Sequence, residues 1–219
     1  MTLNIEQARQ NMIDQQVRAW DVVDMDVLDA LGRVQREHFV PERYRNMAFA
    51  DMALPLGHGE VMLKPVVEGR LLQALALSAD DSVLEVGTGS GYLTACMACL
   101  AQHVTSVDLH ADFTDAARTR LAQAGITNVT LENGEVMHDY QPAGRFDVVV
   151  VSGATPDLPE RMLGWLKPGG RAFVVTGHSP VMVAQLVRPQ ADGSFRAQSL
   201  FETDLPYLVH AAPTAAFML

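Results

Sequence analysis

The chain has 219 residues, 48% of them hydrophobic and 19% charged, a composition that predicts one compact domain with a sizeable core and excludes wholesale disorder. Its 26 acidic and 16 basic residues give a net charge of −10, which disfavours nucleic acid as a partner because phosphate backbones are repelled. No secretory signal is visible, and no apolar run approaches the ~20 residues that cross a bilayer. The two cysteines are too few for a disulfide framework. We therefore expect a cytoplasmic protein that does not enter membranes.

The N-terminal part of the chain is predicted to be helical. Apolar residues recur at helical spacing within residues 13–20 and again within 27–34, and Asp24 is a suitable N-cap for the second helix. The segment "LPLGHGE", residues 54–60, contains one proline and two glycines and is predicted to be a loop. Residues 1–65 are therefore expected to form a helical extension and a substrate-side loop.

The main domain is expected to span residues 66–219, packed with the extension as one compact unit. From Ser82 onward, strand patterns such as "VLEV", "VTSVDL", "NVTL" and "FDVVVV" alternate with helical patterns such as "YLTACMACL", "DFTDAARTRLAQAG" and "PERMLGWL". After a "KPGG" turn, the strand "RAFVVTG" leads into antiparallel strands around Asp192-Gly193. This alternation predicts an α/β fold, with an open, mostly parallel, doubly wound sheet covered on both faces.

Three glycines separate the first strand of this domain from the helix that follows it. A phosphate-binding P-loop would need a lysine after the last glycine, and none follows Gly91. A dinucleotide fingerprint needs Gly-x-Gly-x-x-Gly, whereas Gly87, Gly89 and Gly91 alternate with single residues. The glycines thus form either a bare strand-to-helix turn or a turn that binds a ligand without phosphate.

Acidic residues occur at or near the ends of three neighbouring strands. Glu85 lies in the strand before the first glycine, where it would repel a pyrophosphate but can reach the amino-acid end of a cationic ligand. Asp108 ends the second strand and can accept hydrogen bonds from ribose hydroxyls, and Glu135 after the third strand can accept from an adenine amino group. This combination favours S-adenosyl-L-methionine as the cofactor.

At this point the chain resembles a known family. The motifs "VLEVGTGSGY", "HVTSVD", "NVTLENGE", "FDVVVVSGATPDLP" and "LKPGG" are similar to those of protein-L-isoaspartate O-methyltransferases, over about residues 34–177. The resemblance implies the Rossmann-like fold of class I methyltransferases, with a seven-stranded sheet. It also implies methyl transfer from S-adenosyl-L-methionine to the carboxylate of isoaspartyl residues in damaged proteins.

The resemblance also assigns cofactor contacts by position. Ser152 and Gly153 match the part of the family that lines the methyl-transfer cleft. The predicted cofactor-binding residues are Glu85, Gly87, Thr88, Gly89, Gly91, Asp108, Leu109, Gly134, Glu135, Val136 and Ser152.

The segment "GHGEVMLKP" departs from the family pattern Gly-x-Gly-Gln-Thr-Ile-Ser-Gln-Pro. Leu63 replaces the serine whose hydroxyl is credited with orienting the substrate carboxylate, and Val61 replaces a threonine. The substrate-side candidates are therefore His58, Glu60, Leu63 and Lys64. His58 or Glu60 could act as a base for a hydroxyl or amine acceptor, and Lys64 could pair with an anionic substrate.

The methyl acceptor is expected to be a protein or peptide, or else a small molecule. The alternatives to isoaspartyl methylation are methylation of another oxygen or nitrogen acceptor and a cofactor-binding pseudoenzyme that acts through a protein partner. No metal site is expected, since Cys96 and Cys99 lack a partner pair and lie in a helical pattern. The apolar tail, residues 211–219, is expected to close the sheet or to lie in a subunit interface.

Overall fold

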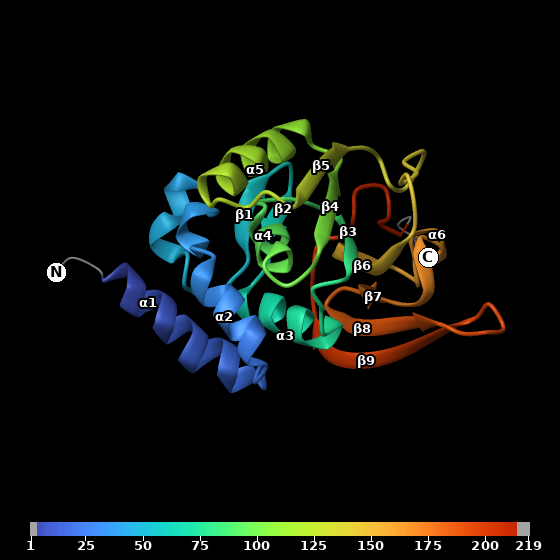
Figure 1. Ribbon diagram of the computed structural model, residues 1–219, viewed down its shortest axis with the longest axis horizontal. Coiled ribbons are helices and arrows are strands. Elements are labelled where there is room, and N and C mark those ends of the chain that lie inside the picture. The colour runs from blue at the N-terminus through green and yellow to red at the C-terminus, as the bar shows by residue number, and fades with distance from the viewer. Residues whose placement is uncertain (1–3, 214–219) are drawn as a thin grey trace, which may run out of the picture.

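A seven-stranded β-sheet forms the centre of the molecule (Figure 1). The computed structural model describes residues 4–213. In space the strands follow the order β5-β4-β3-β6-β7-β8-β9; pairs from β5 to β7 are parallel, and β8 and β9 are antiparallel additions. The strands are β3 Ser82–Val86, β4 His103–Asp108, β5 Val129–Asn133, β6 Phe146–Thr155, β7 Leu166–His178, β8 Val181–Pro189 and β9 Phe195–Thr203. The predicted mostly parallel sheet is confirmed.

Helices cover both faces of the sheet, as a doubly wound fold requires. Because the central strands are apolar on both sides, each face has its own core: Val83 packs into one, and its neighbour Leu84 packs into the other. The helices are α1 Ile5–Met12, α2 Met25–Arg33, α3 Pro65–Leu75, α4 Tyr92–Ala98, α5 Ala111–Gln123 and α6 Glu160–Leu163. The first core takes side chains from α1 to α5, and the second takes them from α6.

The N-terminal part is helical, as predicted. After α1 the chain continues through a π-helical turn, Ile13–Val17, and a 3-10 turn, Arg18–Trp20. The Asp24 side chain caps α2 by accepting hydrogen bonds from the backbone of the first turn. Two further 3-10 segments, Arg36–His38 and Glu42–Met47, lead toward the sheet.

The prediction of a plain loop over residues 54–60 is wrong. The chain there forms a small antiparallel hairpin of β1, Leu54–Gly57, and β2, Glu60–Met62. Its turn residues His58 and Gly59 both have positive φ, at 53° and 86°. Two such residues in succession match the right-handed twist of paired strands, so a two-residue turn can join β1 to β2.

Three other predictions concern the second half of the chain. "KPGG" is not a separate turn, because residues 167–170 form an irregular stretch within β7, between the pairs Phe146–Leu166 and Val148–Arg171. The hairpin of β8 and β9 around Asp192-Gly193 is confirmed. The predicted tail lies largely outside the described residues, which end at residue 213.

Within residues 4–213, no helix combines the length and apolar character needed to cross a bilayer.

Gly69 is a contact point between α3 and the N-terminal segments. A Cβ atom at this position would lie 2.6 Å from Val17 Cγ1 and 3.3 Å from Val22 Cγ2. We expect Gly69→Ala to lower the free energy of unfolding by about 1–3 kcal/mol, because the packed valines would have to shift. Urea denaturation followed by circular dichroism measures this loss.

Gly144→Ala provides the matched control for this prediction. A Cβ at Gly144 meets no atom of the described residues within 4 Å, so the effect of the substitution should stay within about 0.5 kcal/mol. Equal stability of the two variants would contradict the tight packing of the N-terminal part on α3.

The division of the chain after residue 65 stays a prediction. Side chains from both parts meet in one core, so the two parts form one packed unit.

Candidate functional site

A cleft opens at the carboxyl ends of the parallel strands, where open α/β sheets bind ligands. It brings together most of the predicted site residues; His58, Lys64 and Gly91 are outside its lining. The predicted residues that line it are Glu60, Leu63, Glu85, Gly87, Thr88, Gly89, Asp108, Leu109, Gly134, Glu135, Val136, Ser152 and Gly153.

The glycine turn after β3 brings backbone close to the cleft. Gly87 and Gly89 have φ values of 95° and 51°, in the left-handed region that favours glycine. A Cβ at Gly89 would lie 3.1 Å from Leu56 Cδ1, so a larger residue would crowd the opposite wall. Gly91 has a different position: it caps α4, and its Cβ would lie 2.9 Å from Ala117 Cβ of α5. Gly91 therefore allows two helices to pack.

Glu85 is fully buried beneath this turn. Its Oε2 atom accepts hydrogen bonds from Thr94 and from Ser106 Oγ, the latter at 2.6 Å, and Ser106 also bonds Thr88 at 2.6 Å. Its Oε1 atom has no hydrogen-bond partner among residues 4–213. Burial raises the pKa of Glu85 to about 8. An unpartnered carboxylate oxygen in a cleft is suited to a ligand that donates hydrogen bonds.

Asp108 joins two parts of the cleft. One carboxylate oxygen accepts a hydrogen bond from the backbone N–H of Gly89 at 2.9 Å, and the other accepts from that of His110 at 2.8 Å. The side chain is buried. Because each carboxylate oxygen has a second lone pair, Asp108 can still accept hydrogen bonds from a ligand.

Glu135 lies between the cleft and a pair of histidines. Its Oε1 atom pairs with His138 Nδ1 at 2.7 Å and also with His210 Nδ1. The hydrogen bond with His138, and then that with His210, lowers the pKa of Glu135. His210 comes from the C-terminal segment, and nothing in the sequence pattern predicted that this segment reaches the cleft.

The same C-terminal segment forms a wall of the cleft next to β6. Ala154 exchanges backbone hydrogen bonds of 2.9 Å with Pro206 and Leu208. A Cβ at Gly153 would lie 2.7 Å from Leu208 Cδ2, so this glycine permits the close approach. Beside it, the buried Oγ atom of Ser152 has no hydrogen-bond partner in the part of the chain that the structure describes. Leu208 was not predicted as a site residue, because its position depends on long-range pairing.

A buried ion pair holds the substrate-side segment. Leu63 is buried, and its carbonyl accepts a hydrogen bond of 2.7 Å from Arg36 Nη2. The same guanidinium bonds the Ala48 carbonyl at 2.8 Å and pairs with Glu68, which lines the cleft. Burial raises the pKa of Glu68 to about 7, although Arg36 opposes that shift. Arg36 thus connects the N-terminal part to the cleft; the sequence patterns did not indicate it.

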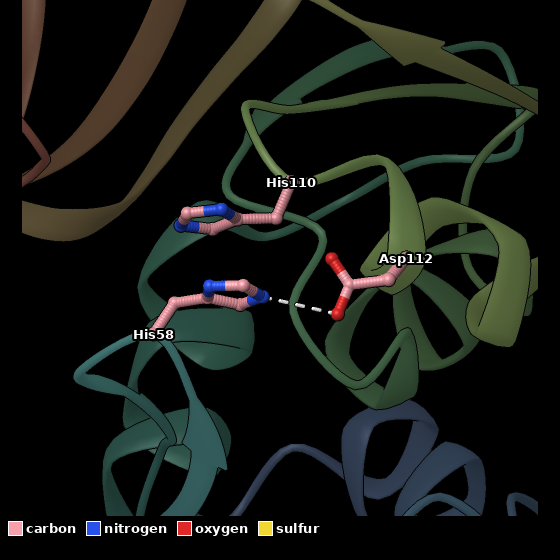
Figure 2. A group of neighbouring side chains, drawn as sticks. All are labelled: His58, His110 and Asp112. Atoms are coloured by element: carbon pink, nitrogen blue, oxygen red, sulfur yellow. Dashed lines mark hydrogen bonds and ion pairs between the residues drawn. The ribbon is translucent and has the colours of Figure 1, made fainter.

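The remaining substrate-side candidates differ in exposure. Glu60 is half-buried in the cleft, and its desolvation raises its pKa. Lys64 is exposed at the N-cap of α3. His58 is exposed in the hairpin turn, where it stacks on His110 and bonds Asp112 (Figure 2).

The lining of the cleft is strongly acidic. Among the described residues that line it there is no lysine and no arginine, and its carboxylates are Glu60, Glu68, Glu85, Asp108 and Glu135. Such a lining favours a cationic ligand over a phosphate, because a cation stabilises ionised carboxylates, whereas burial raises the pKa values of Glu60, Glu68 and Glu85 and an anion would raise them further.

Three comparisons with known proteins agree with this description. The family model of protein-L-isoaspartate(D-aspartate) O-methyltransferases matches residues 7–208. A protein-L-isoaspartate O-methyltransferase of Koribacter versatilis is 36% identical over 183 residues, covering 84% of this chain and 82% of that protein. One of Myxococcus xanthus is 39% identical over 156 residues, covering 71% and 74%.

The fold is also similar to that of solved structures. A Plasmodium falciparum protein assigned to the same enzyme class, crystallised with S-adenosyl-L-homocysteine, superimposes with a TM-score of 0.77. The match covers 91% of this chain and 97% of that one, at 19% sequence identity. At this identity the match supports the fold.

Proposed function

The chain belongs to the protein-L-isoaspartate O-methyltransferase family, and on this premise we propose that it is an S-adenosyl-L-methionine-dependent methyltransferase. The observation that carries the proposal is the fully buried Glu85 in an acidic cleft at the ends of parallel strands. Its Oε1 atom has no hydrogen-bond partner among the described residues. A net cationic cofactor suits such a cleft better than a nucleotide phosphate does.

The residues present fit this cofactor. Glu85 would receive its ammonium end, directly or through water, and the two free lone pairs of Asp108 would receive ribose hydroxyls. Glu135 would face the adenine amino group, and the backbone at Gly87 and Gly89 would leave room for the cofactor's close approach. When bound, the cofactor supplies an electrophilic methyl group on a sulfonium.

The chain's own part in the reaction is alignment and exclusion of water. Transfer of a methyl group is an in-line displacement, which is accelerated chiefly by holding the two reactants in line. Met62, Leu63 and Leu208 give the cleft apolar walls that keep water away from the reacting atoms. A carboxylate acceptor has a pKa near 4 and is ionised at neutral pH, so it needs no general base.

The first candidate for the acceptor is the carboxylate of an isoaspartyl residue in a protein or peptide, as the names of the relatives suggest. The experiment is transfer of a radiolabelled methyl group to an isoaspartyl peptide, with the matching aspartyl peptide as control. Base-labile label on the isoaspartyl peptide alone supports repair. Label only on other acceptors supports altered specificity, and cofactor binding without turnover supports a pseudoenzyme.

A second candidate, an oxygen or nitrogen acceptor of another kind, is favoured by the substrate-side segment. Leu63 offers no hydrogen bond to a substrate carboxylate, and Glu60 adds a half-buried carboxyl group to the same cleft. For a hydroxyl or amine acceptor, Glu60 is placed to take up the proton.

Leu63→Ser distinguishes the two candidates. If the cleft accepts isoaspartyl carboxylates, one added hydroxyl that bonds the substrate should raise kcat/KM for the peptide about tenfold. Leu63→Ala is the control, because it removes the same bulk without adding a hydroxyl. A gain shared by both variants, or absent from both, would show that the hydroxyl has no part in recognising the peptide.

Lys64 is proposed to assist an anionic acceptor from the rim of the cleft. It is exposed, so its charge is screened, and we expect Lys64→Ala to raise KM for the isoaspartyl peptide only about threefold, with kcat unchanged. Arg118→Ala on α5 removes another exposed positive charge and serves as control. Steady-state kinetics with unchanged KM would remove Lys64 from the substrate site.

We propose a cytoplasmic location and no nucleic-acid partner. The free thiols of Cys96 and Cys99 support a reducing compartment. The net charge of −10 supports the absence of a nucleic-acid partner, because it repels phosphate backbones. Fluorescence microscopy of a tagged chain in its host, with fractionation as a check, tests the location. Recovery of the chain outside the cytoplasm would contradict it.

A further inference from the structure

Three side chains that could ligate a metal lie close together, as Figure 2 shows. His110 lines the cleft and the other two, His58 and Asp112, are exposed, so we call this position the mouth of the cleft. His58 comes from the turn between β1 and β2, His110 from the residue before α5, and Asp112 from the first turn of α5. His58 Nε2 lies 3.0 Å from Asp112 Oδ2. One ligand atom from each of the three lies within 4.8 Å of the other two.

The surroundings of this cluster restrict its geometry. The His58 and His110 rings are stacked, with centroids 4.0 Å apart and an interplanar angle of 8°. Phe113 packs edge-on against both rings at 5.4 and 5.3 Å, which gives the cluster one apolar side. His58 itself occupies a left-handed backbone conformation, with φ at 53°. The two imidazoles are thus held together by elements that are distant in the sequence.

We propose that His58, His110 and Asp112 form a binding site for a divalent transition-metal ion of the zinc type. Two imidazole nitrogens and one carboxylate oxygen are the ligands that such ions prefer, whereas Mg²⁺ and Ca²⁺ prefer oxygen ligands alone. Three protein ligands leave a fourth position for water. None of the three ligands is among the cofactor contacts proposed above, and His110 lines the same cleft.

The distances are compatible with coordination after small side-chain rotations. Bonds of 2.0–2.2 Å in a tetrahedral site place ligand atoms about 3.3 Å apart, and the His58–Asp112 pair is already at 3.0 Å. One imidazole must turn out of the stack to direct its nitrogen to the same point. The side chains of His58 and Asp112 are 46% and 65% exposed, so solvent leaves room for that rotation.

The position of the site gives it a consequence for the cleft. His58 belongs to the hairpin that supplies Leu56 and Glu60 to one wall, while His110 and Phe113 line the cleft from the start of α5. An ion bound to both histidines would link the hairpin to the start of α5 at the mouth. We therefore expect a bound ion to slow the release of S-adenosyl-L-homocysteine from the cleft.

A second group of potential ligands provides an internal comparison. Glu135, His138 and His210 also place ligand atoms within 4.8 Å of one another. There, both histidines already pair with a single carboxylate oxygen. That carboxylate is also the one proposed to face the adenine. The mouth cluster is therefore the stronger candidate.

The test is a calorimetric titration of the full chain, without a polyhistidine tag, with ZnCl₂, followed by Co²⁺ absorption spectra. Wild type should bind one ion at the mouth, and the visible bands of Co²⁺ should indicate nitrogen and oxygen ligands. His58→Ala and His110→Ala should each weaken binding at least about tenfold. His103→Ala, at the opposite end of β4, should bind as wild type does.

Two further measurements keep the outcome unambiguous. Circular dichroism melts of each variant exclude misfolding as the cause of lost binding. The double variant His138→Ala/His210→Ala should retain the mouth site. The proposal is overturned if Zn²⁺ binding survives both His58→Ala and His110→Ala, or if it disappears only in the double variant His138→Ala/His210→Ala. It is also overturned if wild type binds no ion. Because the readout is metal binding, it is independent of the proposed methyl transfer.

Discussion

Glu85→Gln is expected to weaken binding of S-adenosyl-L-methionine about 10- to 100-fold. The variant keeps the shape of the side chain but cannot ionise, whereas the ammonium group of the bound cofactor would favour the ionised form of Glu85. Hydrogen bonds to charged groups contribute about 1.5–3 kcal/mol, which corresponds to this range of affinity. Isothermal titration calorimetry on both proteins measures the change.

Glu132→Gln is the matched control for the affinity change. Glu132 lies in β5, accepts a hydrogen bond of 2.7 Å from Tyr140, and is not among the described residues that line the cleft. Its replacement should leave cofactor affinity unchanged within about twofold. Equal affinities of Glu85→Gln and wild type would remove Glu85 from the cofactor site.

The same substitution should alter the pH dependence of stability. Burial raises the pKa of Glu85 to about 8 from a reference value of 4.5, so the folded protein keeps a proton that the unfolded chain releases. The stabilisation from this proton is complete below pH 4.5 and is lost as the pH rises through about 8. Wild type should therefore lose roughly 2–3 kcal/mol relative to Glu85→Gln between pH 6 and pH 9. Urea denaturation at both pH values checks the sign; parallel profiles would contradict the burial.

Arg36→Ala is expected to lower the free energy of unfolding by about 3–5 kcal/mol. The substitution removes the guanidinium bonds to the Leu63 and Ala48 carbonyls and leaves Glu68 buried without its partner. Breaking a buried ion pair from one side costs this much because the remaining group stays desolvated. Chemical denaturation measures the loss. Cofactor affinity should fall as well, since the segment that carries Leu63 loses its anchor.

Arg33→Ala gives a nearby comparison. Arg33 pairs with Asp29 on the surface, with side chains 68% and 58% exposed, and such pairs contribute at most about 1 kcal/mol. The double variant Arg36→Ala/Glu68→Ala should lose less than the sum of its single changes, because no unpaired charge remains. Additive losses, or equal effects of Arg36→Ala and Arg33→Ala, would contradict the role given to the buried pair.

Much of the fold could be predicted from the sequence because its signals are local. Alternating strand and helix patterns predicted the parallel sheet, and Asp24 predicted the start of α2. The hairpin of β1 and β2 was missed because Pro55 and Gly57 indicate a loop, and His58-Gly59 is not one of the dipeptides typical of two-residue hairpin turns.

Parts of the candidate site could also be predicted from the sequence, and other parts could not. The glycine turn and the acidic residues lie at or just after the carboxyl ends of successive parallel strands, so their meeting at one edge of the sheet was predictable. The pairing of Ser106 with Glu85 across two strands could have been found from the strand register. The approach of Leu208 and the bridging by Arg36 depend on long-range packing, and no local pattern encodes either.

The central claim is that the acidic cleft binds S-adenosyl-L-methionine. Calorimetric titration of the purified chain with this compound and with S-adenosyl-L-homocysteine tests it most directly. We predict that one molecule of either compound binds per chain, with Kd values in the micromolar range or tighter, roughly −8 kcal/mol or more negative. Failure of both compounds to bind at millimolar concentration, to a chain shown to be folded, would contradict the claim.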